Sequence, residues 1–266
     1  MGRLFDSQAV TYDQRAGLSE WTCRQVAQAV LALAEVQPGD LVVEVGAGTG
    51  QIGQWLAHGS VRYVGFDLSP AMGHLFRRRV ACWSAAHTLL VADGNQGWPV
   101  REASVRVIFS SRALHLLPLY HVVAESLRVA WSEGAMLIVG RVQQASSSLQ
   151  MQMKHQLHSL LRQHGLQARE GELHRERLLA CLCQRGAKAM APLVVTRWWV
   201  ASTLGEAIAT WRNKPGLGGL DLPPRLKEAV LMELAAWAEE TFGDLEQQVE
   251  SEAAYVLHGA WLRPVV

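Results

Sequence analysis

The residues with the clearest chemical signature form a glycine-rich turn that follows a short apolar run. Residues 41–45 read LVVEV, and residues 46–50 read GAGTG. Such a turn lets the backbone come close to a nucleotide, and the N–H groups of a following helix can face it. Residues 48–53 also fit G-x-G-x-x-G, a dinucleotide pattern that is weak evidence on its own. The turn predicts a nucleotide site but leaves the nucleotide open.

Three carboxylates near the ends of predicted strands make the nucleotide more specific. Glu44 lies in the first strand, Asp67 follows the second and Asp93 follows the third. Asp67 suits ribose hydroxyls in either of the two nucleotide folds that share this turn. Glu44 would repel a pyrophosphate, but it suits a ligand with a cationic tail, such as S-adenosylmethionine. A carboxylate at Asp93 can accept from an adenine amino group.

The elements that must position these residues alternate between strands and helices. We expect strands at 41–45, 61–66, 87–92, 105–110 and 135–139, and helices at 19–36, 51–57, 69–81 and 119–131. This alternation predicts a parallel sheet covered on both faces, with ligands at the carboxyl ends of its strands. After Gly140 the regular alternation of predicted strands and helices ends. Helices are expected at 146–165, 170–184, 204–212 and 224–242, and strands at 192–201 and 253–262.

The length of 266 residues fits one large domain with an added part. We expect residues 1–141 to form the cofactor-binding core with an N-terminal lid. Residues 142–266 should add helical substrate-cover insertions and the last two strands of the same domain. Within that cover, aromatic and methionine side chains could line an acceptor pocket, although ordinary core packing explains each of them equally well. They are Met151, Met153, Leu157, Trp198, Trp199 and Trp211.

Composition excludes several classes of protein. A hydrophobic content of 49% and a charged content of 18% argue against global disorder. A net charge of +1 lacks the basic signature of a dedicated nucleic-acid binder. Four scattered cysteines suit a reducing cytoplasm, and neither a signal peptide nor a membrane span is expected. No motif for a metal site is present in the sequence.

The ordered set of motifs resembles class I S-adenosylmethionine-dependent methyltransferases. The likeness is to the small-molecule branch that includes the ubiquinone/menaquinone biosynthesis methyltransferases. Six segments carry the resemblance: FDSQAVTYDQR as the lid, VVEVGAGTGQIG, YVGFDLSPAM, the adenine-binding VADGNQGWPV, FSSRALHLL and LRVAWSEGAMLIV. It implies an α/β Rossmann-like fold with a seven-stranded, mostly parallel sheet. The last strand should be antiparallel, with helices on both faces and a helical cover.

The resemblance also implies which residues touch the cofactor. The glycines should let the backbone pass close to the methionyl part of the cofactor, and Glu44 should hold its ammonium group. Tyr12 should lie near the methionyl end or over the active site. The predicted cofactor-binding residues are Tyr12, Arg15, Glu44, Gly46, Ala47, Gly48, Gly50, Asp67, Leu68, Met72, Asp93, Gly94, Ser110 and Ser111. His115 and Tyr12 are the catalytic candidates. His115 would act as a base where the acceptor must lose a proton, with local packing as the alternative.

The predicted reaction moves a methyl group from S-adenosylmethionine to O, N or C of a small apolar or aromatic molecule and leaves S-adenosylhomocysteine. Two alternatives stay open: an NAD(P)-dependent oxidoreductase, and a catalytically silent S-adenosylmethionine-binding regulatory protein. A nucleic-acid acceptor is disfavoured, because the FSSRALHLL segment lacks the D/N-P-P-Y/F element of methyltransferases that act on DNA bases. The sequence is compatible with a monomer or a homodimer.

Overall fold

The computed structural model describes residues 6, 13, 18–82, 86–145, 148–168, 171–214 and 216–262. The predicted cofactor residues Tyr12 and Arg15 lie outside these ranges. The chain divides into two compact units. Unit 1 comprises Met1–Arg141, Glu172–Thr196 and Tyr255–Val266, and unit 2 comprises Val142–Gly171 and Arg197–Ala254. The assignment of residues 142–266 to a substrate cover stays a prediction.

Eight strands of the described chain form one sheet. They are β1 (Leu41–Val45), β2 (Arg62–Asp67), β3 (His87–Val91), β4 (Val107–Ser111), β5 (Met136–Gln144), β6 (Lys188–Ala189), β7 (Leu193–Ser202) and β8 (Val249–Trp261). Seven follow the order β3-β2-β1-β4-β5-β8-β6, and β7 pairs with β8 beside this path. The strands from β1 to β5 pair in parallel.

The last strand runs against its neighbours, as predicted. β8 pairs with β6 in antiparallel register. Leu262 N–H donates to the Ala135 carbonyl and Ala145 N–H to the Glu252 carbonyl, so β8 is also antiparallel to β5. The α/β class with a mostly parallel sheet is therefore confirmed. The sequence did not predict β6, because two residues are too few to show strand alternation.

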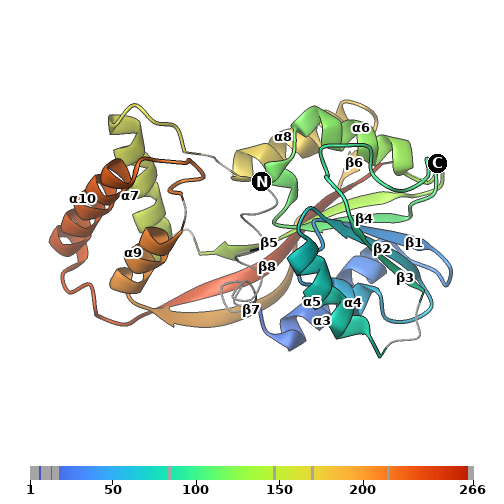
Figure 1. The fold of residues 1–266 in the computed structure, drawn as a ribbon, viewed down its shortest axis with the longest axis horizontal. Coiled ribbons are helices and arrows are strands. Elements are labelled where there is room, and N and C mark those ends of the chain that lie inside the picture. Colours follow the sequence, from blue (N-terminus) through green and yellow to red (C-terminus); the bar gives the residue numbers. More distant parts are fainter. Residues whose placement is uncertain are drawn as a thin grey trace. The chain divides into compact units, whose positions relative to one another are not determined.

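Helices cover both faces of the sheet in unit 1. They are α3 (Glu20–Leu33), α4 (Gly53–Leu56), α5 (Pro70–Val80), the 3₁₀ turn η1 (Leu114–Leu116), α6 (Leu119–Val129) and α8 (Gly171–Cys183). Figure 1 shows α3, α4 and α5 on one face, and α6 and α8 on the other. Serine caps fix two helix starts: Ser19 accepts from Thr22 N–H at 3.1 Å, and Ser69 from Met72 N–H at 3.2 Å.

Unit 2 has its own helical core, formed by α7 (Leu149–Gln163), α9 (Leu204–Asn213) and α10 (Pro224–Phe242). Met153 and Leu157 are buried in that core, with exposures of 0% and 2%. Packing is thus the simplest explanation for these two residues. Trp199 on β7, in contrast, is 69% exposed.

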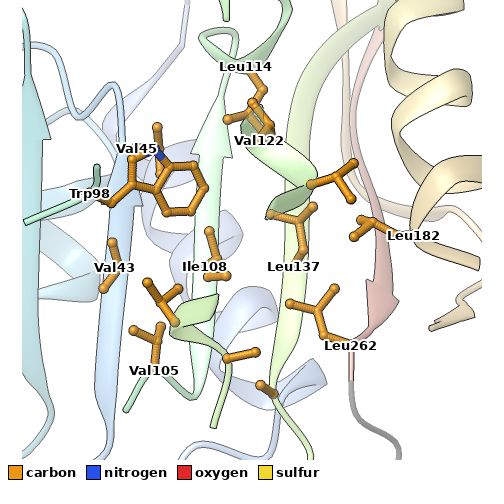
Figure 2. Close-up of a cluster of buried hydrophobic side chains, with 14 of the residues drawn as sticks. Val43, Val45, Trp98, Val105, Ile108, Leu114, Val122, Leu137, Leu182 and Leu262 are labelled. Carbon is orange, nitrogen blue, oxygen red and sulfur yellow. The ribbon is translucent and has the colours of Figure 1, made fainter. Parts of the chain in front are cut away.

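One core cluster fixes the direction of the side chains on β1. Val43 and Val45 lie in it with Ile108 of β4, and Val122 of α6 and Leu182 of α8 pack from the covering helices (Figure 2). Side chains alternate along a strand. Glu44, between the two buried valines, must therefore point to the opposite face, which α3, α4 and α5 cover.

The segment after β3 is held by the ion pair between Glu125 and Arg128 of α6. Trp98, 3% exposed, donates its backbone N–H to the buried carboxylate of Glu125 at 2.6 Å. Arg128 donates to the same carboxylate at 2.8 and 2.6 Å, and also to the carbonyls of Trp98 and Val100. The hydrogen bonds from Arg128 lower the pKa of Glu125. This network fixes the backbone that follows Asp93.

We predict that Glu125→Ala lowers the free energy of unfolding by ~1.5–3 kcal/mol, because it leaves a buried N–H group and a guanidinium without their carboxylate. Urea denaturation at pH 7 measures the change. Since the folded-state pKa of Glu125 is lowered, its contribution is present at neutral pH and should fade as the pH falls through that pKa. The control is Glu228→Ala, which removes an exposed ion pair with Arg212 and should cost under about 1 kcal/mol. Equal losses of unfolding free energy in the two variants would contradict the assignment of Glu125 as a buried carboxylate that stabilises the fold.

Candidate functional site

The glycine turn leaves β1 beside the end of β2. The N–H groups of Gly46 and Ala47 both donate to the Phe66 carbonyl, at 2.9 and 3.1 Å. Gly46, Gly48 and Gly50 have φ values of 71°, 55° and 79°, in the left-handed region that favours glycine. A Cβ atom at Gly46 would collide with Ala113, and one at Gly50 with the Phe76 ring of α5. The turn therefore needs glycine for its own geometry, whatever ligand it approaches.

Asp67 ties the end of β2 to this turn. Its Oδ2 accepts from Gly48 N–H and its Oδ1 from Ser69 N–H, both at 2.9 Å. Burial raises the pKa of Asp67, while the backbone hydrogen bonds, including one from Leu68, oppose that rise. A carboxylate oxygen has more than one acceptor position, so each oxygen can still accept from a ligand hydroxyl. Asp67 is thus a structural anchor and remains a candidate for binding ribose.

Glu44 is buried with an exposure of 3%, and the Tyr63 hydroxyl donates to its Oε2. Burial raises the pKa of Glu44 to about 8. The Tyr63 hydrogen bond opposes the rise, and the charge of Asp67 adds to it. A Cβ atom at Gly53 would collide with the Glu44 carboxylate, so α4 can begin this close only with glycine. The site thus holds a poorly solvated carboxylate, which a cationic group would stabilise in its charged form.

Asp93 and Gly94 form a tight turn after β3. Asp93 Oδ1 accepts from the backbone N–H of Asn95 at 2.9 Å and from its side-chain amide at 2.7 Å. The Gly94 carbonyl accepts from the Trp98 indole at 3.3 Å. Asp67 pairs with Val91 in the register between β2 and β3, so Asp93 follows at the same edge of the sheet. Both hydrogen bonds from Asn95 go to Asp93 Oδ1.

The remaining predicted residues differ in their surroundings. Ser110, at the end of β4, is fully buried and donates to the Val45 carbonyl at 2.8 Å. The Ser111 hydroxyl lies 2.7 Å from that of Tyr255. Met72 is 3% exposed on α5, and His115 is exposed in η1. Both serine hydroxyls have protein partners, so a role for Ser110 and Ser111 in cofactor binding stays a prediction, as do the roles of Met72 and His115.

Two acids near the N-terminus contact the same elements, and sequence reasoning did not single them out. Asp6 accepts from the Ser69 hydroxyl at 2.5 Å and from Ala71 N–H at 3.3 Å, at the start of α5. Asp13 accepts from the Thr49 hydroxyl at 2.5 Å, inside the glycine turn, and pairs with Arg79. The only signal for them was their place in the FDSQAVTYDQR segment.

Other polar residues at this edge were also missed. Arg112 follows β4 with a φ of 61°, an uncommon value for a side chain with Cβ. Its charge acts on the buried Tyr255 and on Cys23 of α3. Burial raises the pKa of Cys23 to about 11, so this thiol is a poor nucleophile. The contacts of these residues depend on packing between distant segments, which the sequence does not reveal.

Comparisons with known proteins agree with this geometry. Residues 42–134 match the family model described as a methyltransferase domain. A protein-L-isoaspartate O-methyltransferase from Methylorubrum populi is 33% identical over 114 residues, which cover 43% of this chain and 50% of that protein. The chain spans between about a third and a half of the length of the curated relatives it matches.

Two solved structures share the fold over nearly the whole chain. A proposed methyltransferase from Bacillus halodurans C-125 has a TM-score of 0.58 and 13% identity, over 90% of this chain and 99% of that one. The cyclase SpnF also has a TM-score of 0.58, with 16% identity, over 100% of this chain and 96% of that one. At these identities the likeness shows the fold alone.

The sheet order and the glycine turn define an α/β protein of the Rossmann-like nucleotide-binding class. Within this class, residues 42–134 match the methyltransferase-domain family. The resemblance seen in the sequence is thereby confirmed, and S-adenosylmethionine is the cofactor of that family. Within the described ranges, no helix has the length and apolar character to cross a membrane. The same parts of the chain contain no group of three or more side chains that could hold a metal ion.

We predict that Glu44→Gln gains stability relative to the wild type as the pH rises. The folded-state pKa of Glu44 is raised from 4.5 to about 8, so the native protein holds this proton more tightly than the unfolded chain. The resulting stabilisation is complete below the unfolded pKa and is lost as the pH rises through about 8. Glutamine carries no charge to bury. Urea denaturation of both proteins between pH 5 and pH 9 measures the difference.

The control for this experiment is Glu239→Gln, on the exposed surface of α10. Its stability relative to the wild type should not follow the same trend. A difference between Glu44→Gln and the wild type that stays constant from pH 5 to pH 9 would show that Glu44 is not a strained, buried acid.

Proposed function

We propose that this protein transfers the methyl group of S-adenosylmethionine to a small molecule and releases S-adenosylhomocysteine. The observation that carries the proposal is the buried carboxylate of Glu44, which lies against Gly53 at the start of α4. The ammonium group of the cofactor's methionyl part would relieve the cost of charging this carboxylate. The pyrophosphate of NAD(P) could not stabilise the charged form of Glu44 in this way, because it is itself an anion. This contrast favours methyl transfer over the oxidoreductase alternative.

The other residues at this edge of the sheet fit the same cofactor. Asp67 would accept from the ribose hydroxyls, because each of its oxygens keeps an acceptor position. Asp93 Oδ2 would accept from the adenine amino group, and Gly94 N–H would donate to a ring nitrogen. Leu68 would flank the adenine. The turn from Gly46 to Gly50 would bring the backbone, including Ala47, close to the methionyl part.

Methyl transfer from this cofactor would need few catalytic groups from the protein. When bound, S-adenosylmethionine supplies a methyl group that its sulfonium already activates for in-line displacement. The protein must orient the acceptor and exclude water, which can lower the barrier by roughly 7–11 kcal/mol. A base is needed only where the acceptor loses a proton, and we propose His115 for that case, because η1 follows β4 at this edge. Tyr12 stays the second catalytic candidate.

We propose an apolar or aromatic small molecule as the acceptor, supported by the near-neutral net charge of +1, which does not favour nucleic acid. All four cysteines are free thiols, which supports a reducing compartment such as the cytoplasm. The likeness to the cyclase SpnF favours one second candidate, a protein of this fold that binds the cofactor without moving its methyl group. Formation of S-adenosylhomocysteine with a panel of phenols, amines and carboxylic acids would separate the two.

We predict that Asp67→Ala weakens the binding of S-adenosylhomocysteine by ~1.5–3 kcal/mol, roughly ten- to more than a hundred-fold, through the loss of charged hydrogen bonds. Titration calorimetry measures this change, and NADH should give no binding heat. The matched control is Asp40→Ala, because Asp40 lies before β1 at the opposite edge and its carboxylate accepts from the nearby Gln37 N–H. Unchanged affinity in Asp67→Ala would remove this residue from the site. Tight NADH binding without S-adenosylhomocysteine binding would reject the proposed function.

A further inference from the structure

A cavity lies in unit 1, between α3 and α4. Its volume is about 420 Å³, and it is lined by Arg24, Ala27, Gln28, Leu31, Trp55 and His58. We call it the α3–α4 groove. This volume falls in the range of small-molecule sites, which is about 300–1,000 Å³. The proposed function does not use any of these residues.

One end of the α3–α4 groove lies away from the edge of the sheet that holds the cofactor candidates, whereas Arg24, near the start of α3, and Trp55, in α4, lie nearer to that edge. Leu31 is in the last turn of α3, the helix that leads to the start of β1. His58 comes after α4, shortly before β2 begins at Arg62. Both residues therefore lie toward the amino ends of the strands. The glycine turn and Asp67, in contrast, follow the carboxyl ends of β1 and β2.

The lining combines an aromatic surface with cationic and amide donors. The guanidinium carbon of Arg24 lies 5.5 Å from the centre of the Trp55 ring, the geometry of a cation–π pair. On α3, Arg24 and Gln28 are one turn apart, as are Ala27 and Leu31, so a polar row runs beside an apolar row. None of the described residues lining the groove has a carboxylate, so a bound anion would meet no like charge there.

We propose that the α3–α4 groove binds a planar small molecule that carries a carboxylate, at a site separate from the cofactor. The ring system would lie against Trp55, Ala27 and Leu31. The carboxylate would meet the Arg24 guanidinium, which binds carboxylates through paired N–H donors, with Gln28 and His58 as further polar neighbours. Arg24 is exposed, so water and salt weaken its attraction, and the affinity should fall as ionic strength rises.

The first test is titration calorimetry with 2-naphthoate, a planar anion, at low salt. The full chain is titrated with and without S-adenosylhomocysteine. We expect one site with similar affinity in both titrations. The neutral 2-naphthamide and the non-planar cyclohexanecarboxylate should each bind at least tenfold more weakly. Absence of naphthoate binding, or equal affinity for all three compounds, would overturn the proposal. So would loss of binding when S-adenosylhomocysteine is present, because the ligand would then occupy the cofactor site.

The second test locates the site with variants. Arg24→Gln keeps a side chain of similar shape without the charge and should weaken 2-naphthoate binding at least fivefold. Trp55→Leu removes the aromatic surface and should weaken it to a similar degree. Arg78→Gln is the control, because Arg78 is an exposed arginine on α5, outside the groove, and its loss should leave the affinity unchanged.

Thermal melting checks that each variant folds. Arg24 is exposed, so Arg24→Gln should fold as the wild type does and keeps the test decisive if Trp55→Leu does not fold. Naphthoate affinity that is the same in Arg24→Gln as in the wild type would overturn the proposal.

Discussion

The buried carboxylate of Glu44 is the constraint on which the rest of this site depends. The core on one face of β1 takes Val43 and Val45, so Glu44 is forced onto the other face, away from water. Tyr63 gives it one hydrogen bond, and Gly53 lets α4 begin directly against it. A charge in such a place is costly unless a cation pairs with it. Among the residues that the structure describes, Glu44 is therefore incompletely compensated, and a cationic ligand can stabilise its charged form.

The parallel sheet brings the other acidic residues to the same edge. Backbone hydrogen bonds from Gly46 and Ala47 to the Phe66 carbonyl hold the glycine turn beside β2, and Asp67 closes it through Gly48 N–H. Because β2 and β3 also pair in parallel, Asp93 follows at this edge. The ion pair of Glu125 with Arg128 then holds the backbone beyond it. Asp67 and Asp93 thus each have a structural task and also lie where a nucleotide could be bound.

The sequence predicted the alternation of strands and helices, the glycine turn and the acidic strand ends, because these signals are local. It did not predict β6, which is too short to show a pattern. The contact between Tyr63 and Glu44 depends on the register of two strands, and those of Asp6 and Asp13 on how a distant segment packs. Met153 and Leu157, considered for an acceptor pocket, lie in the core of unit 2. The sequence could not separate these two uses, because apolar residues on one helix face suit both a core and a pocket.

The most direct test of the role of Glu44 is the number of protons released when S-adenosylhomocysteine binds. Calorimetry at pH 7 in buffers of different ionisation enthalpy gives this number. With a pKa of about 8, Glu44 is largely protonated at this pH before binding, and pairing with the ligand's ammonium group lowers that pKa. The account predicts that binding releases a large part of one proton from the wild type and none from Glu44→Gln. Binding to the wild type with no proton release would contradict it.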